Sequence, residues 1–341
     1  MNEILKKLES PKYKPVFESI KSISEQFKST LSCDAALPAS YKTVKNVVLC
    51  GMGGSALAAH ILQALNVSLA PFCFYNGYEV PAHVGSDTLF IASSYSGSTE
   101  EVLASAEAAK KKGAKIVGLT AGGALGEWLL KNKFPFIKFY ERLNPCGQPR
   151  YGLGYALGAL FNIFIQLGLA DLKMADVLGA ISKSKEPDVA DAARLAKELR
   201  GFAPIVAASG FLEGNAHVFV NQINETCKVF SEWHSIPELN HHLMEGLKRP
   251  AGNKYLKFLF VESGFYSKAI AARVKITQDV VRKNKIRYTV YRVNGKTKLE
   301  QVLNFLTFGS LVGLILSIDY GENPTDIPWV NYFKKQLKMM L

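Results

Sequence analysis

A chain of 341 residues with 48% hydrophobic and 21% charged residues has the balance of a soluble globular protein and is long enough for two domains of ordinary size. Its formal net charge of +12 is compatible with nucleic acid, an acidic membrane surface or an anionic substrate as a partner. Because the lysines are scattered and no aromatic residues are interleaved with them, we expect a solvated basic surface and no nucleic-acid binding.

The first half of the sequence alternates short apolar runs with helical segments. After one or two helices in the first 30 residues, broken by Pro11 and Pro15, the pattern predicts a parallel sheet covered by helices on both faces. In the last predicted helix of this half, Gly154 and Gly158 lie four residues apart, where they permit close packing. The expected strands are residues 47–50, 71–75, 88–93, 115–119 and 136–138, and the expected helices are residues 55–65, 99–112, 125–131 and 150–169.

A polar segment at residues 182–187 marks the start of a second round of strands and helices. It divides the chain into an N-terminal domain at residues 1–170, a linker at residues 171–188 and a C-terminal domain at residues 189–341. The two halves share a layout without obvious sequence identity. The expected strands of the second half are residues 204–208, 255–262 and 287–293, and its expected helices are residues 189–200, 213–226, 266–283, 298–318 and 330–339.

The cysteines and the apolar runs indicate the compartment. Five widely spaced cysteines without a C-x-x-C pair predict neither a zinc site nor a disulfide framework, and fit a reducing compartment. The start of the sequence lacks the apolar region of a signal peptide. The longest apolar run, residues 305–318, is interrupted by Thr307 and Ser310 and is too short to span a bilayer, so it predicts a buried helix. We therefore expect a cytoplasmic protein without membrane segments.

Two loops in the first half are rich in the residue types that bind phosphate. The sequence GMGGS (residues 51–55) follows the first strand, and SYSGST (residues 94–99) follows the third. Serine and threonine at the start of a helix suit a phosphate, because free backbone N–H groups and the helix dipole favour an anion there. Glycines let the backbone approach the ligand. Either loop alone is also typical of an ordinary helix cap or close-packing turn; together they predict a site for a small phosphorylated ligand.

Neither loop carries the signature of a nucleotide site. A dinucleotide fingerprint requires an acidic residue about 20 residues beyond its glycines, but the second strand ends at Tyr75 and Glu79 comes late. A P-loop requires Gly-Lys followed by Ser or Thr, which the loop at residues 51–55 lacks. No motif for a cofactor is visible.

Two charged residues stand where the helix dipole disfavours them. Arg150 lies at the start of the helix expected at residues 150–169, and Glu225 lies near the end of the helix expected at residues 213–226. A cation at a helix start is easier to explain if it faces an anion, and a carboxylate near a helix end suits a general base. Taken alone, Arg150 is equally compatible with a surface residue, and Glu225 with a solvated helix residue.

Two adjacent histidines, His241 and His242, follow a loop that contains Trp233 and Pro237. The pair lacks the H-E-x-x-H spacing of a metal site. The functional interpretation is one histidine that acts as an acid or base. The structural alternative is a capping histidine at the edge of the core.

Taken in order, these segments resemble the sugar isomerase (SIS) family, and most closely its bifunctional phosphoglucose/phosphomannose isomerase branch. The Ser-x-Ser-Gly-x-Thr turn is widespread among SIS domains, so it indicates sugar phosphate without indicating a reaction. The Pro-Arg, Asn-Glu and Glu-x-Asn-His segments together are much more specific to the isomerase branch. The matching segments, which span residues 46–337, are GMGGS (51–55), SYSGSTEE (94–101), Pro149-Arg150, Asn224-Glu225, ELNH (238–241) and a C-terminal lysine helix.

The resemblance implies a fold and a reaction. The fold is α/β: two SIS-type domains, each a flavodoxin-like α/β/α sandwich around a parallel sheet. The reaction is the reversible aldose–ketose isomerisation of glucose 6-phosphate, and of mannose 6-phosphate, to fructose 6-phosphate through a cis-enediol. It also implies a homodimer in which the neighbouring subunit supplies the histidine, and it implies no metal and no redox cofactor.

The resemblance also implies a role for each matching residue. Glu225 moves a proton between C1 and C2, and Arg150 stabilises the enediolate. His241, with His242 as the weaker candidate, opens the sugar ring with help from a lysine of the last helix. The apolar spacing of that helix aligns Lys334 better than Lys335 with the family's lysine. Thr325 matches a small hydroxyl residue linked to accepting mannose phosphate. The substrate-binding residues implied are Gly53, Gly54, Ser55, Ser94, Ser96, Thr99 and Thr325.

Two other functions stay open at this point. An amino-sugar phosphate synthase or deaminase uses the same domains, although its glutaminase form needs an N-terminal nucleophilic cysteine and the first cysteine here is Cys33. A non-catalytic sugar-phosphate sensor is the alternative from another class. Transcriptional regulators of that kind carry a helix-turn-helix domain before a single SIS domain, whereas this sequence has a short lead-in followed by two such halves.

Overall fold

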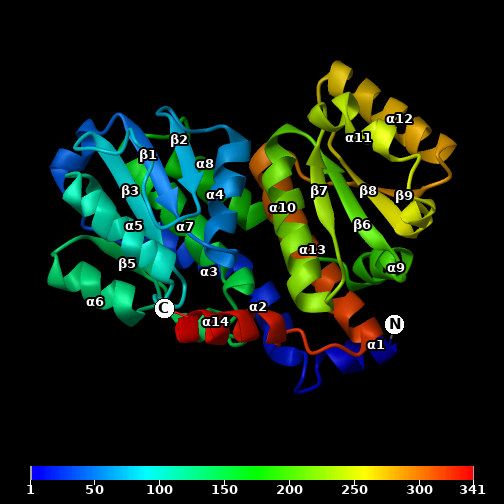
Figure 1. The fold of residues 1–341 in the computed structure, drawn as a ribbon, viewed down its shortest axis with the longest axis horizontal. Coiled ribbons are helices and arrows are strands. Elements are labelled where there is room, and N and C mark those ends of the chain that lie inside the picture. The colour runs from blue at the N-terminus through cyan, green and yellow to red at the C-terminus, as the bar shows by residue number, and fades with distance from the viewer. Residues whose placement is uncertain (1, 341) are drawn as a thin grey trace.

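The computed structural model describes residues 2–340. Residue 1, at which the first expected domain begins, and residue 341, at which the second ends, lie outside the described residues. Two lobes, each built around one parallel sheet, lie side by side in Figure 1. The strands of the first lobe are β1 (Asn46–Cys50), β2 (Phe72–Tyr75), β3 (Thr88–Ser93), β4 (Lys115–Thr120) and β5 (Phe136–Lys138). The strands of the second lobe are β6 (Ala203–Ala208), β7 (Glu232–Ser235), β8 (Leu256–Glu262) and β9 (Arg287–Arg292).

Helices pack on these sheets and between them. Those of the first half are α1 (Asn2–Leu8), α2 (Lys14–Lys21), α3 (Ile23–Leu31), α4 (Gly54–Leu65), α5 (Glu100–Lys111), α6 (Gly123–Lys131) and α7 (Leu153–Gln166). The remaining helices are α8 (Met174–Lys183), α9 (Val189–Leu199), α10 (Glu213–Gln222), α11 (Leu243–Gly246), α12 (Lys268–Lys283), α13 (Lys298–Tyr320) and α14 (Pro328–Met340).

Both sheets have the same strand order. The first runs β2-β1-β3-β4-β5 and the second β7-β6-β8-β9, and neighbouring strands in each are parallel. The second order is therefore the first with one strand fewer. The order 2-1-3-4-5 is that of flavodoxin-like sheets. The predicted fold class, two parallel-sheet α/β units of SIS type, is confirmed.

The strands alternate their side chains between two cores, because successive residues of a strand point to opposite faces. On β1, Val47 and Leu49 belong to the core shared with α4 and α7, whereas Val48 and Cys50 belong to the core shared with α5 and α6. Each sheet is thus covered on both faces, which explains the continuous apolar runs in the sequence.

The two lobes share one continuous core where α4 packs against α10 (Figure 1). Leu57 of α4, Phe219 of α10 and Leu311 of α13 are all members of this core. The close approach depends on Gly214 of α10, where an added Cβ would lie 2.5 Å from the carbonyl oxygen of His60. Within the first lobe, Gly154 and Gly158 of α7 face the backbone of α3 in the same way, so the predicted close packing is confirmed and its partner is α3.

Three features differ from the sequence-based expectation. Strand β7 occupies part of the segment predicted as a loop; its sequence EWHS has no apolar run because it is an edge strand that pairs only with β6. Helix α8 fills much of the segment expected as a linker, and the proposed domain boundaries stay a prediction. The helix expected at residues 213–226 divides into α10 and a π-helical turn, Ile223–Cys227.

Helix α13 is longer than the apolar run from which it was predicted, which corrects the expectation that it is too short to span a membrane. Its 23 residues are long and apolar enough to span a bilayer, with a mean hydropathy of 1.8 in the best window, whereas the sequence pattern indicated a run too short to do so. However, 94% of that window is buried inside the protein. This burial is typical of a core helix, and the predicted buried helix is confirmed.

Candidate active site

The two hydroxyl- and glycine-rich loops lie at the carboxyl ends of β1 and β3, which are adjacent in the first sheet. In this strand order, the chain turns from β1 to β2 on one side and from β3 to β4 on the other. Ligands of open parallel sheets bind at such a switch point, at the carboxyl ends of the strands. The fold therefore places both loops where a ligand is expected.

Hydrogen bonds join the two loops. The Ser55 hydroxyl accepts from the backbone N–H of Tyr95 at 2.9 Å, and the Ser93 hydroxyl donates to the Ser55 carbonyl at 2.8 Å. Within the second loop, the Ser94 and Thr99 hydroxyls lie 2.8 Å apart. The Ser96 hydroxyl lies 2.9 Å from that of Ser98, and both serines are exposed.

The helices that follow the loops begin without a side-chain cap. Thr99 stands at the N-cap position of α5, but its side chain makes no capping hydrogen bond and faces Ser94 instead. Gly53, at the N-cap position of α4, has a φ of 48° and no side chain to offer. The first N–H groups of a helix need partners. In α4 the Ser55 and Ala56 N–H groups already donate to the Met52 and Gly53 carbonyls at 3.0 Å, so it is the start of α5 that offers backbone donors to an anion. The structure therefore shows no ordinary side-chain cap at the start of α4 or of α5.

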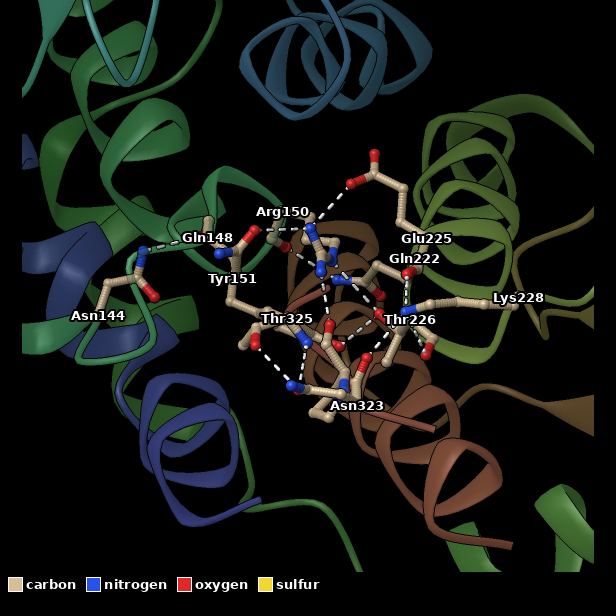
Figure 2. A network of polar contacts seen from close by, with 11 residues as sticks. Asn144, Gln148, Arg150, Tyr151, Gln222, Glu225, Thr226, Lys228, Asn323 and Thr325 are labelled. Atoms are coloured by element: carbon tan, nitrogen blue, oxygen red, sulfur yellow. Dashed lines mark hydrogen bonds and ion pairs between the residues drawn. The ribbon is translucent and has the colours of Figure 1, made fainter. Parts of the chain in front are cut away.

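Arg150 lies at the centre of a polar network between the lobes (Figure 2). It belongs to a 3-10 turn, Pro149–Tyr151, that precedes α7, and it is only 1% exposed. Its Nη1 donates to the Glu225 carboxylate at 2.8 Å and to the Gln148 side chain at 3.0 Å. Its Nε donates to the Thr226 hydroxyl at 3.3 Å, and its Nη2 donates to the Pro324 carbonyl. Arg150 is therefore a buried guanidinium that faces a carboxylate, and the surface interpretation is wrong.

Glu225 reaches Arg150 from the second lobe. It lies on the π-helical turn Ile223–Cys227, and its side chain is 27% exposed. The next residue, Thr226, is buried and bonds the Tyr151 hydroxyl at 2.8 Å. Burial raises the pKa of Tyr151, which keeps that hydroxyl neutral. The carboxylate is thus partly open to solvent while its backbone is held firmly.

Gly54 connects the phosphate side of the site to the arginine. A Cβ added at Gly54 would lie 2.9 Å from the backbone nitrogen of Arg150 and 3.0 Å from the carbonyl carbon of Pro149. The first turn of α4 therefore rests directly on the turn that carries Arg150. Of the predicted residues, Arg150 lies on a turn in contact with the first loop, and Glu225 pairs with Arg150. Six more belong to the two loops themselves: Gly53, Gly54, Ser55, Ser94, Ser96 and Thr99.

Thr325 lies beside this cluster, in the segment between α13 and α14. Its backbone N–H and hydroxyl both donate to the side-chain oxygen of Asn323, at 3.2 and 2.9 Å. The intervening Pro324 accepts from Arg150. The segment that contains Thr325 is therefore part of the same network (Figure 2).

The structure does not bring the expected histidine and lysine to the cluster within one chain. His241 ends a 3-10 turn, Glu238–His241, after β7; both it and His242 are exposed, and His242 lies 3.8 Å from the Glu238 carboxylate. Lys334 and Lys335 are exposed on α14, which runs along the opposite end of the molecule from α11 in Figure 1. No hydrogen bond within residues 2–340 joins any of these four residues to Arg150 or Glu225.

Several network members were not predicted from the sequence. Gln148 adjoins the Pro-Arg pair, so its position was a usable signal. Thr226, Lys228 and Asn323 carry no sequence signal, because their importance depends on contacts between segments about 75 to 175 residues apart, such as those of Arg150 with Thr226 and Pro324. Residues 2–340 contain no group of three or more His, Cys, Asp or Glu side chains arranged to hold a metal ion.

Two parallel-sheet units, with paired hydroxyl- and glycine-rich loops at the first switch point and an Arg–Glu pair between the units, are the layout of a protein of the SIS class. Comparison with known families agrees. The "SIS domain" family matches residues 40–124, and the family described as "Bacterial phospho-glucose isomerase C-terminal SIS domain" matches residues 188–337.

The chain belongs to the bifunctional phosphoglucose/phosphomannose isomerase family. A protein of that name from Caldicellulosiruptor bescii is 32% identical over 94% of this chain and 98% of its own length. A second, from Thermoplasma volcanium, is 29% identical over 90% of this chain and 97% of its own length. Among solved structures, a hypothetical protein from Thermus thermophilus superimposes with a TM-score of 0.71 at 16% identity, over 99% of this chain and 93% of that one. That similarity supports the fold alone.

Proposed function

We propose that this protein interconverts glucose 6-phosphate and fructose 6-phosphate, and also mannose 6-phosphate and fructose 6-phosphate, by proton transfer between C1 and C2. The observation that carries the proposal is the Glu225 carboxylate held 2.8 Å from the Arg150 guanidinium, next to loops suited to a phosphate. Moving a proton alpha to a carbonyl requires a base and a fixed positive charge for the oxygen that becomes negative. The relatives' names support the same reaction.

The uncapped starts of α4 and α5 hold the phosphate. Ser55, Ser94, Ser96 and Thr99 contribute hydroxyls, the N–H groups at the start of α5 add donors, and Gly53 and Gly54 let the sugar approach the backbone. This arrangement fixes one end of the open-chain sugar, so that C1 and C2 lie near the Arg–Glu pair.

Glu225 acts as the base that removes the proton from C2 of the aldose and returns it to C1. A cis-enediol forms between the two steps, and the proton that leaves the O2 hydroxyl passes to O1 as the ketose forms. Arg150 stabilises the negative charge that develops on the enediolate oxygens. A guanidinium has five N–H donors in a planar fork, so it can face the carboxylate and the oxyanion together. No step needs a metal or a redox cofactor.

We further propose a homodimer in which His241 of one subunit completes the partner's site and opens the sugar ring, with Lys334 assisting. Two observations support this proposal. His241 is exposed and, within residues 2–340, makes no hydrogen bond to the Arg–Glu pair of its own chain. Helix α14 has no buried residue and exposes large apolar side chains, among them Trp329 at 81% and Phe333 at 62%. We also propose a cytoplasmic location, which suits five free cysteines.

The test is a coupled assay of purified protein in EDTA, started separately with glucose 6-phosphate and mannose 6-phosphate. We expect fructose 6-phosphate to form from both. Turnover of glucose 6-phosphate alone would keep the mechanism and remove the role of Thr325 in accepting mannose phosphate. If neither sugar turns over while sugar phosphate still binds tightly, the protein is a sensor.

Substituting the base separates an enzyme from a sensor. We expect Glu225→Gln, which keeps the shape and a hydrogen bond to Arg150, to lower kcat by about 10³-fold or more. Calorimetric binding of an unreactive open-chain hexitol 6-phosphate should change little. Glu127→Gln is the matched control, because Glu127 is an exposed carboxylate on α6, and it should leave kcat unchanged. Normal turnover by Glu225→Gln would exclude Glu225 as the base.

A further inference from the structure

Glu225 stands on an irregular piece of helix whose end is held in an unusual way. The turn Ile223–Cys227 is π-helical, a form that occurs often at functional sites. Because the last carbonyl groups of a helix have no partner within the helix, whatever binds them determines how firmly this turn is held. The residue that ends the turn therefore bears on the position of the carboxylate.

Lys228 ends the turn in a left-handed conformation, with a φ of 56°. Glycine is the usual residue at such helix ends, because a Cβ there crowds the neighbouring carbonyl. The lysine side chain folds back over the helix end. Its Nζ donates to the Glu225 carbonyl at 2.9 Å and more weakly to the Thr226 carbonyl at 3.4 Å. A glycine could adopt this backbone but could make neither contact.

The same ammonium group also reaches the segment between α13 and α14. It donates to the Asn323 carbonyl at 2.8 Å, across 95 residues of sequence (Figure 2). The next carbonyl, that of Pro324, accepts from Arg150, and the Asn323 side chain holds Thr325. One lysine thus joins the turn that carries the proposed base to the segment that contacts the proposed arginine and the predicted specificity threonine.

We propose that Lys228 is a positioning residue for the isomerisation, and that its ammonium group holds the Glu225 turn and the 323–325 segment in register. The inference rests on the proposed function of Glu225. Arg150 also bridges the turn and the segment, through Thr226 and Pro324. Loss of Lys228 removes the second of these two connections and lets the turn and the segment shift against each other. Proton transfer between adjacent carbons is sensitive to displacements of about 1 Å. The proposed phosphate loops precede α4 and α5, and the hydrogen bonds of the Lys228 side chain go to the Glu225, Thr226 and Asn323 carbonyls and not to these loops, so phosphate binding should survive its loss.

Lys228→Gly tests this role and distinguishes it from a merely structural one. Glycine relieves the left-handed backbone, so a role limited to capping predicts a fold that is little changed and normal turnover. The positioning role predicts that kcat falls by about tenfold or more. It further predicts that KM for fructose 6-phosphate stays within about twofold and that the ratio of glucose to mannose phosphate turnover changes. Lys228→Arg keeps cationic donors and should recover part of kcat.

Lys285→Gly is the matched control. Lys285 follows α12 with a φ of 60°, is exposed, and donates no side-chain hydrogen bond within residues 2–340. The control makes the same backbone change far from the network and should leave kcat unchanged. The inference is overturned if Lys228→Gly keeps wild-type kcat, or if Lys285→Gly loses as much. A wild-type protein that turns over neither sugar would instead refute the proposed function, so the two failures are distinguishable.

Discussion

Arg150 is the residue on which the site depends. A guanidinium that is 1% exposed must be paired and hydrogen-bonded, because an uncompensated buried charge is strongly destabilising. Here the compensation comes from a carboxylate, a side-chain amide, a hydroxyl and a carbonyl. Two of these partners, Glu225 and Thr226, lie in the second lobe. The charge proposed to stabilise the enediolate therefore also holds the base beside it.

Gly54→Ala tests the contact between the phosphate loop and this arginine. The new Cβ would lie 2.9 Å from the Arg150 nitrogen, so the 3-10 turn has to shift. We expect a stability loss of about 1–3 kcal/mol and a fall in kcat/KM of about tenfold or more, measured by denaturant unfolding and by the coupled assay. Gly179→Ala on α8 is the control, because no atom lies within 4 Å of its Cβ position. Wild-type kcat/KM in Gly54→Ala would mean that the loop and the arginine act independently.

At the scale of elements, the packing of α4 against α10 sets the distance between the proposed phosphate loop and the proposed base. Helix α4 begins at the first phosphate loop, and α10 leads into the turn that carries Glu225. A histidine pair holds the two helices: the Nδ1 atoms of His60 and His217 lie 3.1 Å apart. The His60 ring lies against Phe74 at a tilt of 39° with ring centroids 3.8 Å apart, and His217 stacks on Trp233 at 5.7 Å. This hydrogen bond needs one imidazole to donate and the other to accept, so the contact between His60 and His217 cannot persist when both are protonated.

The histidine pair predicts acid sensitivity. Burial, and then the neighbouring His217, lower the pKa of His60 from 6.5 to about 3. Between these two values the unfolded chain binds the proton and the folded chain does not. The stability contribution is therefore fully present above pH 6.5 and is lost as the pH falls toward 3. In His60→Gln, the free energy of unfolding should fall by about 2 kcal/mol less than in the wild type as the pH is lowered below 6.5. Urea unfolding at a series of pH values measures this difference. His83→Gln, which changes an exposed histidine, should not show it; an unchanged acid limb in His60→Gln would contradict the assignment.

At the scale of the whole molecule, one chain brings together the proposed phosphate loops, the proposed base Glu225 and Arg150, whereas the candidate ring-opening histidine makes no hydrogen bond to the Arg–Glu pair within residues 2–340. In a two-fold symmetric dimer, each subunit can supply His241 to the site of the other. The exposed apolar residues of α14 are large enough to contribute to such an interface. The proposed dimer therefore explains both the position of His241 and the exposed apolar side chains of α14.

Subunit mixing tests the shared site. Glu225→Gln and His241→Asn should each be nearly inactive alone. Mixed dimers contain one site with both wild-type residues if the histidine acts across the interface, so refolding the two variants together should restore roughly a quarter of wild-type activity. The coupled assay after co-refolding measures this recovery, with each variant refolded alone as the control. Absence of recovery in dimers confirmed by ultracentrifugation would place both residues in one subunit's site.

The sequence by itself determined the fold class and the identity of most candidate residues. Apolar runs that alternate with helices are local patterns, as are glycine- and serine-rich loops after strands, because each depends on residues close together in the chain. Edge strand β7 escaped prediction because half of its surroundings are solvent, which removes the apolar signal.

Only the tertiary structure decided what these residues do to one another. The burial of Arg150, its pairing with Glu225 75 residues away and the reach of Lys228 to Asn323 depend on how two separately patterned lobes pack through α4 and α10. The same packing leaves His241 outside the network of its own chain. Long-range contacts leave no periodic trace in a single sequence, because charged and polar residues look alike whether they face solvent or a partner across a domain interface.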